Sequence, residues 1–553
     1  MRRMLMLVLA GGCVIASLGA SAARAWPPGA VPLCAASGEQ IDLVALSDGA
    51  GGVYAAWSDQ RSGDYDVYVQ HLDASGEPAA GYPFDGQLVG GGAGTQRAPL
   101  LALDSDGQCW LVWKDTFAAI LRRAKLPPTL PPAYVPTSVV MTRPVPATAS
   151  VAICAVSPDQ LFLFFAPGGS GSGVLMVKSI GGPNDPTTMA LGSGDASSCG
   201  SVCAIPDGAG GAFVAWQRTK NSVIDLAIQR VSPGPIVASG WPQNGAVLCS
   251  AVGSQESPAI VPDGDGGLFA TWADRRSGNS DIYLARLSPS GATPSDWPLN
   301  GIAVSTATGT QALPQLTRVG SGGVLLAWED SRTASTDIYA AGWSSTGVRD
   351  PGWPVNGGPV SAATSIQLTP VLAPSTDGSA YLAWATLQGG VSFDVAVARA
   401  SSHGGSTPAP NGQLVSTAIN DQVAPVIVPG PANDAIVLWQ DFRDGAADLY
   451  AQHISLGTPL DAPGPGMSSA ALRVWPQPAR GGVARVDFVL ADDQPATLTL
   501  LDVAGRVVGE GQVVRGAGAH VRMLGSAALA PGLYLARLEH AGGTQSARML
   551  VVR

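Results

Sequence analysis

The chain has 553 residues, a formal net charge of −10 and only 13% charged residues. This composition supports large apolar cores, and the acidic balance excludes a nucleic-acid-binding surface, which needs a basic face. The 70 glycines and 44 prolines break helices and favour short strands joined by tight turns. We therefore expect an all-β protein.

The N-terminus has the pattern of an export signal. Arg2 and Arg3 precede an apolar run, and the small residues Ala23 and Ala25 follow with the spacing of a cleavage site before Trp26. The sequence predicts a signal peptide over residues 1–25 and a secreted or cell-surface protein. No second long apolar segment follows, so we expect no transmembrane segment in the mature chain.

A tryptophan-centred segment recurs about every 56 residues along most of the chain. The tryptophans are Trp57, Trp113, Trp216, Trp272, Trp328, Trp384 and Trp439. The double interval between the second and third contains "LFLFFAPGG", in which Phe165 stands near the missing tryptophan. The sequence therefore predicts eight units of about 55 residues. Seven units stay open if residues 114–195 contain one unit and an excursion.

Each unit has the same order of strands and turns. An apolar strand leads through an Asp-Gly or Gly-Gly turn to the tryptophan strand, a third strand such as "DIYLARL" follows, and a short fourth strand comes after "WPxNG". Repeated four-stranded units are typical of a β-propeller, which we predict over residues 26–458. The segments starting at Trp26 and Trp241 match, so residues 26–36 are expected to complete the sheet of Trp439 and close the ring.

Four units share the pattern Trp-x-Asp-x-Arg, with a second aspartate five residues after the arginine. The sixteen residues are Trp57, Asp59, Arg61, Asp66, Trp272, Asp274, Arg276, Asp281, Trp328, Asp330, Arg332, Asp337, Trp439, Asp441, Arg443 and Asp448. A group copied around a ring cannot converge on one substrate atom. We interpret it as structural, with each arginine forked between two carboxylates. The alternative is a carbohydrate or peptide site repeated in each unit.

Residues that break the repeat are better candidates for function. Arg122, Arg123 and Lys125 form the one dense basic segment of this acidic chain, and a contact with an anion or an acidic polymer is a hypothesis for them. No motif for a nucleotide, a catalytic triad or a zinc protease is present, so no catalytic residue and no metal ligand is assigned. No cofactor is expected, although the Asp-rich turns at 104 and 263 leave calcium as a weaker alternative.

Six cysteines remain outside the export segment, and fifteen disulfide pairings among them stay open.

The texture of the chain changes after a Pro/Gly/Ser-rich linker at residues 459–470. Residues 471–553 alternate apolar and polar side chains with frequent turns, which predicts a small immunoglobulin-like β-sandwich of about seven strands. The segments "WPQP", "LLDVAGRVV" and "LAPGLYLARL" and the terminal "ARMLVVR" resemble the C-terminal sorting domain of type IX secretion and the flagellar hook-capping (FlgD-like) domain. The resemblance to the sorting family implies an export machine as a partner.

The repeat leads us to expect a non-enzymatic binding or scaffolding propeller at the cell surface, with an extracellular glycan or protein as its ligand. The reason is that no unrepeated His, Glu or Asp group stands out. The alternative is an extracellular hydrolase or lyase, glycosidase-like, with carboxylates facing the propeller channel. A purely structural surface protein is a second alternative.

Overall fold

The computed structural model describes residues 26–456, except 28, 132–138, 141–144, 146–147, 167–173, 182–187, 192–197, 321 and 409–410. It also describes residues 472–552, except 476–478, 481–482, 491–493, 504, 510, 516–517, 527–528 and 541–542. The expected signal peptide and the expected linker at 459–470 lie outside the described residues. The chain divides into two compact units, Met1–Gly457 and Thr458–Arg553. No helix within the described ranges is long and apolar enough to cross a membrane.

The described part of the first unit is built from antiparallel sheets whose strands follow one another in the chain. The first sheet contains β2 (Gln40–Ser47), β3 (Val53–Asp59), β4 (Asp66–Leu72) and β5 (Gln87–Gly90). The second contains β6 (Gln96–Leu103), β7 (Cys109–Asp115), β8 (Ile120–Leu126) and β9 (Val139–Val140). The third contains β10 (Val151–Ser157), β11 (Gln160–Phe165), β12 (Leu175–Ile180) and β13 (Thr188–Leu191). The fourth contains β14 (Ser198–Pro206), β15 (Ala212–Lys220), β16 (Val223–Ser232), β17 (Ile236–Val237) and β18 (Ala246–Cys249).

Four further sheets continue the same order. The fifth contains β19 (Gln255–Pro262), β20 (Leu268–Asp274), β21 (Asp281–Leu287) and β22 (Ile302–Ser305). The sixth contains β23 (Gln311–Val319), β24 (Gly323–Asp330), β25 (Asp337–Trp343) and β26 (Gly358–Ser361). The seventh contains β27 (Gln367–Pro374), β28 (Ser379–Gln388), β29 (Ser392–Ser401), β30 (Ser406–Thr407) and β31 (Gln413–Leu414). The eighth contains β32 (Gln422–Pro429), the 3₁₀ turn η1 (Pro431–Asn433), β33 (Ala435–Asp441), β34 (Asp448–Ile454) and β1 (Val31–Cys34).

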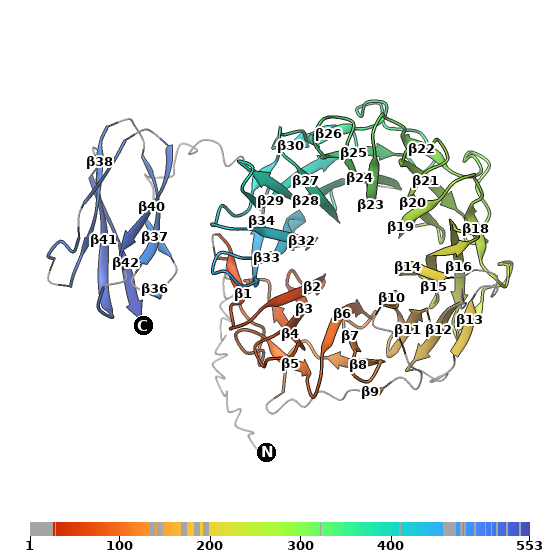
Figure 1. The fold of residues 1–553 in the computed structure, drawn as a ribbon, viewed down its shortest axis with the longest axis horizontal. Coiled ribbons are helices and arrows are strands. Elements are labelled where there is room, and N and C mark those ends of the chain that lie inside the picture. Colours follow the sequence, from red (N-terminus) through yellow and green to blue (C-terminus); the bar gives the residue numbers. More distant parts are fainter. Residues whose placement is uncertain are drawn as a thin grey trace, which may run out of the picture. The chain divides into compact units, whose positions relative to one another are not determined.

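The sheets of the first unit follow one another around a ring, as Figure 1 shows. The first strand of each sheet lies nearest the centre: β2, β6, β10, β14, β19, β23, β27 and β32. Each of these inner strands packs against the inner strand of the next sheet. Because successive strands are antiparallel, the turns between first and second strands lie on one face of the ring. The turns between second and third strands lie on the other.

The ring closes between the two ends of the unit. β1 pairs antiparallel with β34, with Val31 opposite Ala451, and so adds the fourth strand to the sheet of Trp439. The side chains of Leu33 and Cys34 on β1 are buried. This is the arrangement that the match between the Trp26 and Trp241 segments predicts, and it leaves the ring without an open edge at this point.

The repeated tryptophans occupy the core between sheets. All seven are at most 1% exposed, and Phe165 is buried in the same way. A glycine with positive φ lies over five of the indole rings; these glycines are Gly86, Gly245, Gly301, Gly357 and Gly412. A Cβ atom at any of them would stand 2.3 to 2.7 Å from the tryptophan. The glycine at this position of the repeat is therefore required by the turn and by the packing.

The second unit contains two sheets around one apolar core. One sheet contains β35 (Arg473–Trp475), β37 (Val483–Leu490) and β40 (Gly518–Gly525). The other contains β36 (Ala479–Arg480), β42 (Gly543–Val552), β41 (Gly532–His540), β38 (Ala496–Leu501) and β39 (Gln512–Val514). Both sheets contribute buried residues to the same cluster, among them Val486, Leu498 and Leu538.

Candidate functional site

The repeated aspartate and arginine form a closed hydrogen-bond network. In the fifth sheet, Trp272 Nε1 donates to Asp274 Oδ2 over 2.8 Å, and Arg276 donates to both carboxylate oxygens over 2.9 and 2.7 Å. Asp274 is fully buried, and the Arg276 guanidinium lies 3.8 Å from the centre of the Tyr283 ring. Burial acts to raise the pKa of Asp274, but the hydrogen bonds from Arg276 and Trp272 outweigh it and hold the pKa below its usual value.

The same geometry recurs in the other three units that carry the full pattern. Arg61, Arg332 and Arg443 each bind both oxygens of one aspartate, which is Asp59, Asp330 or Asp441 respectively. In three of the four units, the second aspartate has a hydrogen-bond partner other than the arginine that we expected to fork between two carboxylates. This aspartate accepts a hydrogen bond from a hydroxyl group: Asp66 from Ser62, Asp281 from Ser277 and Asp337 from Thr333. A structural role for this network stays a prediction, which the first experiment of the Discussion tests.

Three residues of the network were not identified from the sequence. Arg61 Nη2 lies 3.0 Å from Cys34 Sγ, Arg276 Nη2 lies 3.1 Å from Cys249 Sγ, and Ser305 takes this position beside Arg332. The common spacing of Cys34 and Cys249 after Trp-Pro was the available signal. The six cysteines from Cys34 to Cys249 are all unpaired, so none of the fifteen disulfide pairings is formed.

The seventh sheet carries an incomplete copy of the network. Thr386 stands at the position of the first aspartate, and no arginine follows it, whereas Asp394 keeps the position of the second aspartate. Asp394 is buried, and its Oδ1 has no hydrogen-bond partner among the described residues. Burial, together with the charges of Asp441 and Asp421, raises the pKa of Asp394 to about 6.

Asp394→Asn is expected to stabilise the protein by about 1–3 kcal/mol at pH 7 and to have little effect below pH 4. The folded state holds the proton of Asp394 more tightly than the unfolded state does. The stabilisation that proton binding by Asp394 gives the wild type is therefore lost as the pH rises from about 4 through 6, whereas the amide of the variant does not titrate. Denaturant unfolding of both proteins from pH 4 to 8 measures the difference, with exposed Asp296→Asn as the control. A difference that does not depend on pH would contradict the prediction.

The basic segment of the second sheet is held by acidic and aromatic neighbours. Arg122 Nε donates to Asp115 over 2.8 Å, and Lys125 forms ion pairs with Asp104 and Asp159. Arg123 lies on the same face of β8 as Lys125, and both lie over the indole ring of Trp110. Because strand residues alternate, Arg122 points to the opposite face. The hypothesis of an anion site at these three residues stays a prediction.

The Asp-rich turns use their carboxylates within the protein. Asp263 accepts the backbone N–H groups of Asp265 and Gly267 and forms an ion pair with Arg286, and Asp104 makes similar turn contacts. In the residues that the structure describes, no group of three or more His, Cys, Asp or Glu side chains could hold a metal ion. Calcium binding at these turns stays a prediction.

A β-bulge recurs at the N-terminal end of seven inner strands. One residue there has a positive φ and interrupts the pairing with the second strand; these residues are Asp42, Ala98, Ser201, Ser257, Leu313, Thr369 and Ala424. Bulges of this kind are enriched near active sites because they redirect side chains. In this ring, the bulges change the direction of the backbone and of its side chains at the end where the inner strands begin.

Titratable side chains that do not repeat from sheet to sheet gather at these bulges. We call Asp42, Arg97, Lys114, Glu256 and Glu329 the inner rim. Lys114 and Glu329 directly follow a core tryptophan, at a position that holds Ala273 or Ala385 in other sheets. Sequence reasoning missed them because the surrounding repeat is regular, although the change from alanine to a charge at a fixed position was the available signal.

The rim side chains interact across neighbouring sheets. Arg97 Nε and Nη2 donate to Asp42 over 3.0 and 3.2 Å, and Ser58 Oγ donates to the same carboxylate over 2.8 Å. Glu329 Oε1 accepts the N–H of Thr369 in the next sheet over 2.7 Å. Glu256 has a looser partner, because 3.6 Å separates its Oε1 from Arg275 Nε.

The carboxyl groups of the rim have opposite electrostatic surroundings. Burial raises the pKa of Glu329, and the hydrogen bond from Thr369 only partly opposes this. For Asp42, burial is outweighed by the hydrogen bonds from Arg97 and Ser58, which lower its pKa. Burial also lowers the pKa of Lys114. A carboxyl group whose pKa is raised, like that of Glu329, is suited to act as an acid.

No family model and no curated protein matches this chain in sequence. Among solved structures, the endo-arabinase of Bacteroides thetaiotaomicron is 11% identical, with 54% of this chain and 90% of that chain covered and a TM-score of 0.27. A thermostable family-43 glycoside hydrolase is 13% identical over 59% and 98%, with a TM-score of 0.25. A fungal alcohol oxidase is 11% identical over 96% and 100%, with a TM-score of 0.38. The all-β propeller class rests on the ring of mostly four-stranded antiparallel sheets itself (Figure 1).

The expectation of a non-enzymatic binding or scaffolding protein is wrong. The similar solved structures are mainly glycoside hydrolases rather than scaffolds. The sequence argument against an enzyme was that no unrepeated Glu or Asp group stood out. Asp42, Glu256 and Glu329 are unrepeated carboxyl groups that lie at the same end of the ring, in the first, fifth and sixth sheets. The similarities themselves concern the fold, so the assignment of chemistry has to come from the rim.

Proposed function

We propose that this protein is an exported extracellular hydrolase of the glycosidase type, which acts on a saccharide polymer at the inner rim of an eight-bladed propeller. The observation that carries the proposal is the unrepeated carboxyl groups of the rim, with Glu329 held toward its protonated form and Asp42 toward its anion. The separate sheet formed by residues 151–191 and the closure by β1 support eight blades rather than seven.

Glu329 is the proposed general acid. Hydrolysis of a glycosidic bond needs a carboxylic acid that still holds its proton near neutral pH and gives it to the leaving oxygen. The raised pKa of Glu329 suits this role, and the N–H of Thr369 fixes the orientation of its carboxyl group.

Glu256 is the proposed base, because its carboxyl group is one-third exposed and belongs to the adjacent fifth sheet. A carboxylate beside the sugar can accept a proton from water or attack the sugar directly. A lyase would use the same base to remove a proton beside a carboxylate of the sugar.

Glu329→Gln and Glu256→Gln are each expected to lower turnover by about 10²–10⁴-fold. The amide at 329 can still accept the Thr369 N–H, so the thermal unfolding temperature should stay near that of the wild type. The measurement is reducing-end release from a panel of plant and microbial polysaccharides, with absorbance of unsaturated ends recorded to separate lyase from hydrolase products.

Gln440→Ala is the matched control, because Gln440 follows Trp439 just as Glu329 follows Trp328. It should keep nearly full turnover. Absence of turnover by the wild type on the whole panel, or full turnover by Glu329→Gln, would refute the proposal.

For the second unit, we propose an immunoglobulin-like sandwich that directs export as a sorting-type domain. The support is the resemblance of its motifs and the presence of two sheets that share one core. Together with the N-terminal signal pattern, this supports a proposed location outside the cell, where polymeric saccharides are accessible substrates.

A further inference from the structure

A cavity of about 920 Å³ lies on the face of the ring opposite the inner rim, between the sixth and seventh sheets. Its walls are the turn after β23, the turn after β25, and the two corresponding turns of the seventh sheet. Both kinds of turn lie at the end of the sheets away from the bulges. A cavity of this size is in the range of small-molecule sites. It does not belong to the proposed hydrolase site, and its existence does not depend on that proposal.

Other sheets carry an ion pair at the position that this cavity occupies. In the fifth sheet, Asp263 follows the inner strand and binds Arg286 on the third strand over 2.9 Å. Arg286 also donates to the carbonyl oxygen of Ser345 in the turn of the next sheet over 3.2 Å. Asp207 with Arg230 and Asp48 with His71 make the same contacts in the fourth and first sheets.

The sixth sheet lacks both members of this pair. Val319 stands nine residues before Trp328, as Asp263 stands nine before Trp272. Gly342 is paired with Leu325 in the register that joins Arg286 to Phe269. The turn of the seventh sheet lies against this glycine, since a Cβ atom at Gly342 would stand 2.3 Å from the carbonyl oxygen of Ser402. A valine and a glycine replace a carboxylate and a cation, so the space between the two sheets is not filled by an internal ion pair.

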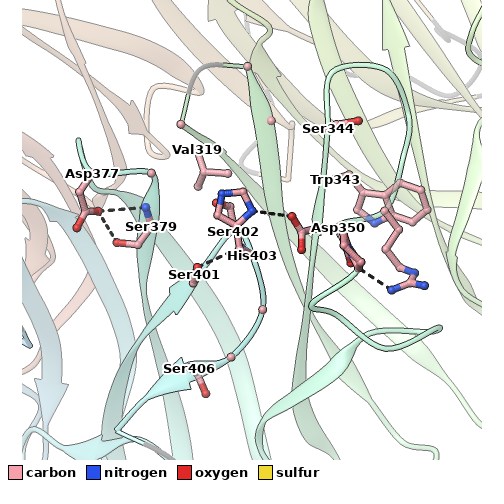
Figure 2. Close-up of a pocket in the computed structure, with 18 of the residues that line it drawn as sticks. Val319, Trp343, Ser344, Asp350, Asp377, Ser379, Ser401, Ser402, His403 and Ser406 are labelled. Atoms are coloured by element: carbon pink, nitrogen blue, oxygen red, sulfur yellow. Dashed lines mark hydrogen bonds and ion pairs between the residues drawn. The ribbon is translucent and has the colours of Figure 1, made fainter.

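The lining of the cavity combines an aromatic ring, hydroxyl groups and balanced charges. Figure 2 shows Asp377 and Ser379 on one side and Asp350 and Trp343 on the other, with the His403 ring directed at Asp350. His403 Nδ1 lies 2.7 Å from Asp350 Oδ2, and Arg399 forms an ion pair with Asp377. The formal charges of Arg349 and Arg399 balance those of the two aspartates.

Two observations indicate unused hydrogen-bonding capacity in this lining. Trp343 Nε1 is buried and has no hydrogen-bond partner among the described residues. Ser402 and Ser406 also line the cavity, and their hydroxyl groups donate to no acceptor among the described residues. Buried polar groups normally have partners, so the indole N–H of Trp343 is a polar group of the cavity wall that no described residue satisfies.

We propose that this cavity binds a neutral oligosaccharide. A sugar chain presents hydroxyl groups that both donate and accept, and the fixed carboxylate–cation pairs and serines of the lining offer both functions. The apolar face of a sugar ring can pack on the half-buried Trp343, which is how an amphipathic aromatic side chain contributes to a site. The balanced charge of the walls disfavours a phosphate or a polyanion, because neither sign is in excess.

The test is calorimetric titration of neutral gluco-, xylo- and arabino-hexaoses into the full chain carrying Glu329→Gln, which prevents cleavage during the measurement. Ser402→Trp fills the cavity from a turn position whose backbone is unstrained. Ala74→Trp is the matched control, because Ala74 is exposed at the equivalent turn of the first sheet.

Ser402→Trp is expected to remove one binding site for the recognised hexaose, or to weaken it at least about tenfold, with an unchanged unfolding temperature. Ala74→Trp should leave the binding as in the parent protein. If the rim also binds the sugar, the parent shows two sites and the variant one. If the rim binds nothing, the parent shows one and the variant none, so failure of the proposed function and failure of this inference are distinguishable. Equal binding by Ser402→Trp and its parent, no binding of any neutral hexaose, or binding of phosphate or oligogalacturonate alone would overturn the proposal.

Discussion

Arg276→Ala is expected to lower the free energy of unfolding by about 3–5 kcal/mol at pH 7, because it leaves a fully buried carboxylate without its counter-charge. Asp274 would keep the Trp272 N–H and one backbone N–H, which together do not replace two charge-assisted bonds from a guanidinium. Arg276 also donates to the carbonyl oxygen of Asn300, and so it holds the turn that covers the core tryptophan. Denaturant unfolding of the purified chain measures the loss.

The pH dependence of this variant gives a second, independent measurement. In the wild type, the lowered pKa of Asp274 means that its contribution to stability is present above the unfolded pKa and is lost as the pH falls through the folded pKa. In Arg276→Ala the carboxyl group is buried without the guanidinium, so protonation relieves the variant. The deficit relative to the wild type should therefore be largest near pH 7 and should shrink below pH 4.

Two further variants serve as controls for the arginine experiment. Arg276→Lys keeps the charge but not the planar fork, so it should lose less stability than the alanine variant. Arg318→Ala removes an exposed arginine of the neighbouring sheet and should change the unfolding free energy by less than about 0.5 kcal/mol. Lost turnover or lost sugar binding by Arg276→Ala at an unchanged unfolding temperature would show that the network belongs to a site instead.

Removal of residues 26–36 is expected to cause the largest loss of stability, more than about 5 kcal/mol. The deletion takes away β1, which fills one side of β34, and it removes the buried side chains of Trp26, Leu33 and Cys34. Burial of a large apolar side chain contributes about 1.5–3 kcal/mol, and the exposed edge of β34 would in addition be free to pair with other chains. We expect a broad, early thermal transition and oligomers in size-exclusion chromatography.

A chain that begins at Trp26 is the control for this deletion and should unfold like the full-length protein. A synthetic peptide of residues 26–36 should restore part of the stability by pairing with β34, since an extended peptide can add a strand to an open sheet edge. A shortened chain that stays monomeric with an unchanged transition would show that β1 does not close the ring.

The repeat made much of the fold predictable from the sequence. Regular spacing of Trp57, Trp272, Trp328 and Trp439 predicted equivalent sheets, because only a closed set of sheets can bury the same large ring at the same position each time. The match of the Trp26 segment to the Trp241 segment predicted the partner of β1. The third sheet was harder, since Phe165 and a changed spacing conceal the pattern, and an excursion could not be excluded by composition.

The site was less predictable than the scaffold. The expectation of a non-enzymatic protein followed from the repeated aspartates and arginines. Their side chains are hydrogen-bonded to one another inside each sheet. The rim residues Asp42, Glu256 and Glu329 come from three different positions of the repeat and from three separate sheets. Their position at the same end of the ring depends on the strand order and on the bulges, and neither leaves a local pattern in the sequence.

The cavity of the sixth sheet illustrates the same division. Val319 and Gly342 are ordinary strand residues when each is considered alone, and only their alignment with Asp263 and Arg286 identifies a missing ion pair. The sequence by itself determined the strands, their turns and the tryptophan core, because these depend on side-chain period and on local backbone preferences. The tertiary structure alone decided which unrepeated side chains share a space, because that depends on contacts between residues that are far apart in the chain.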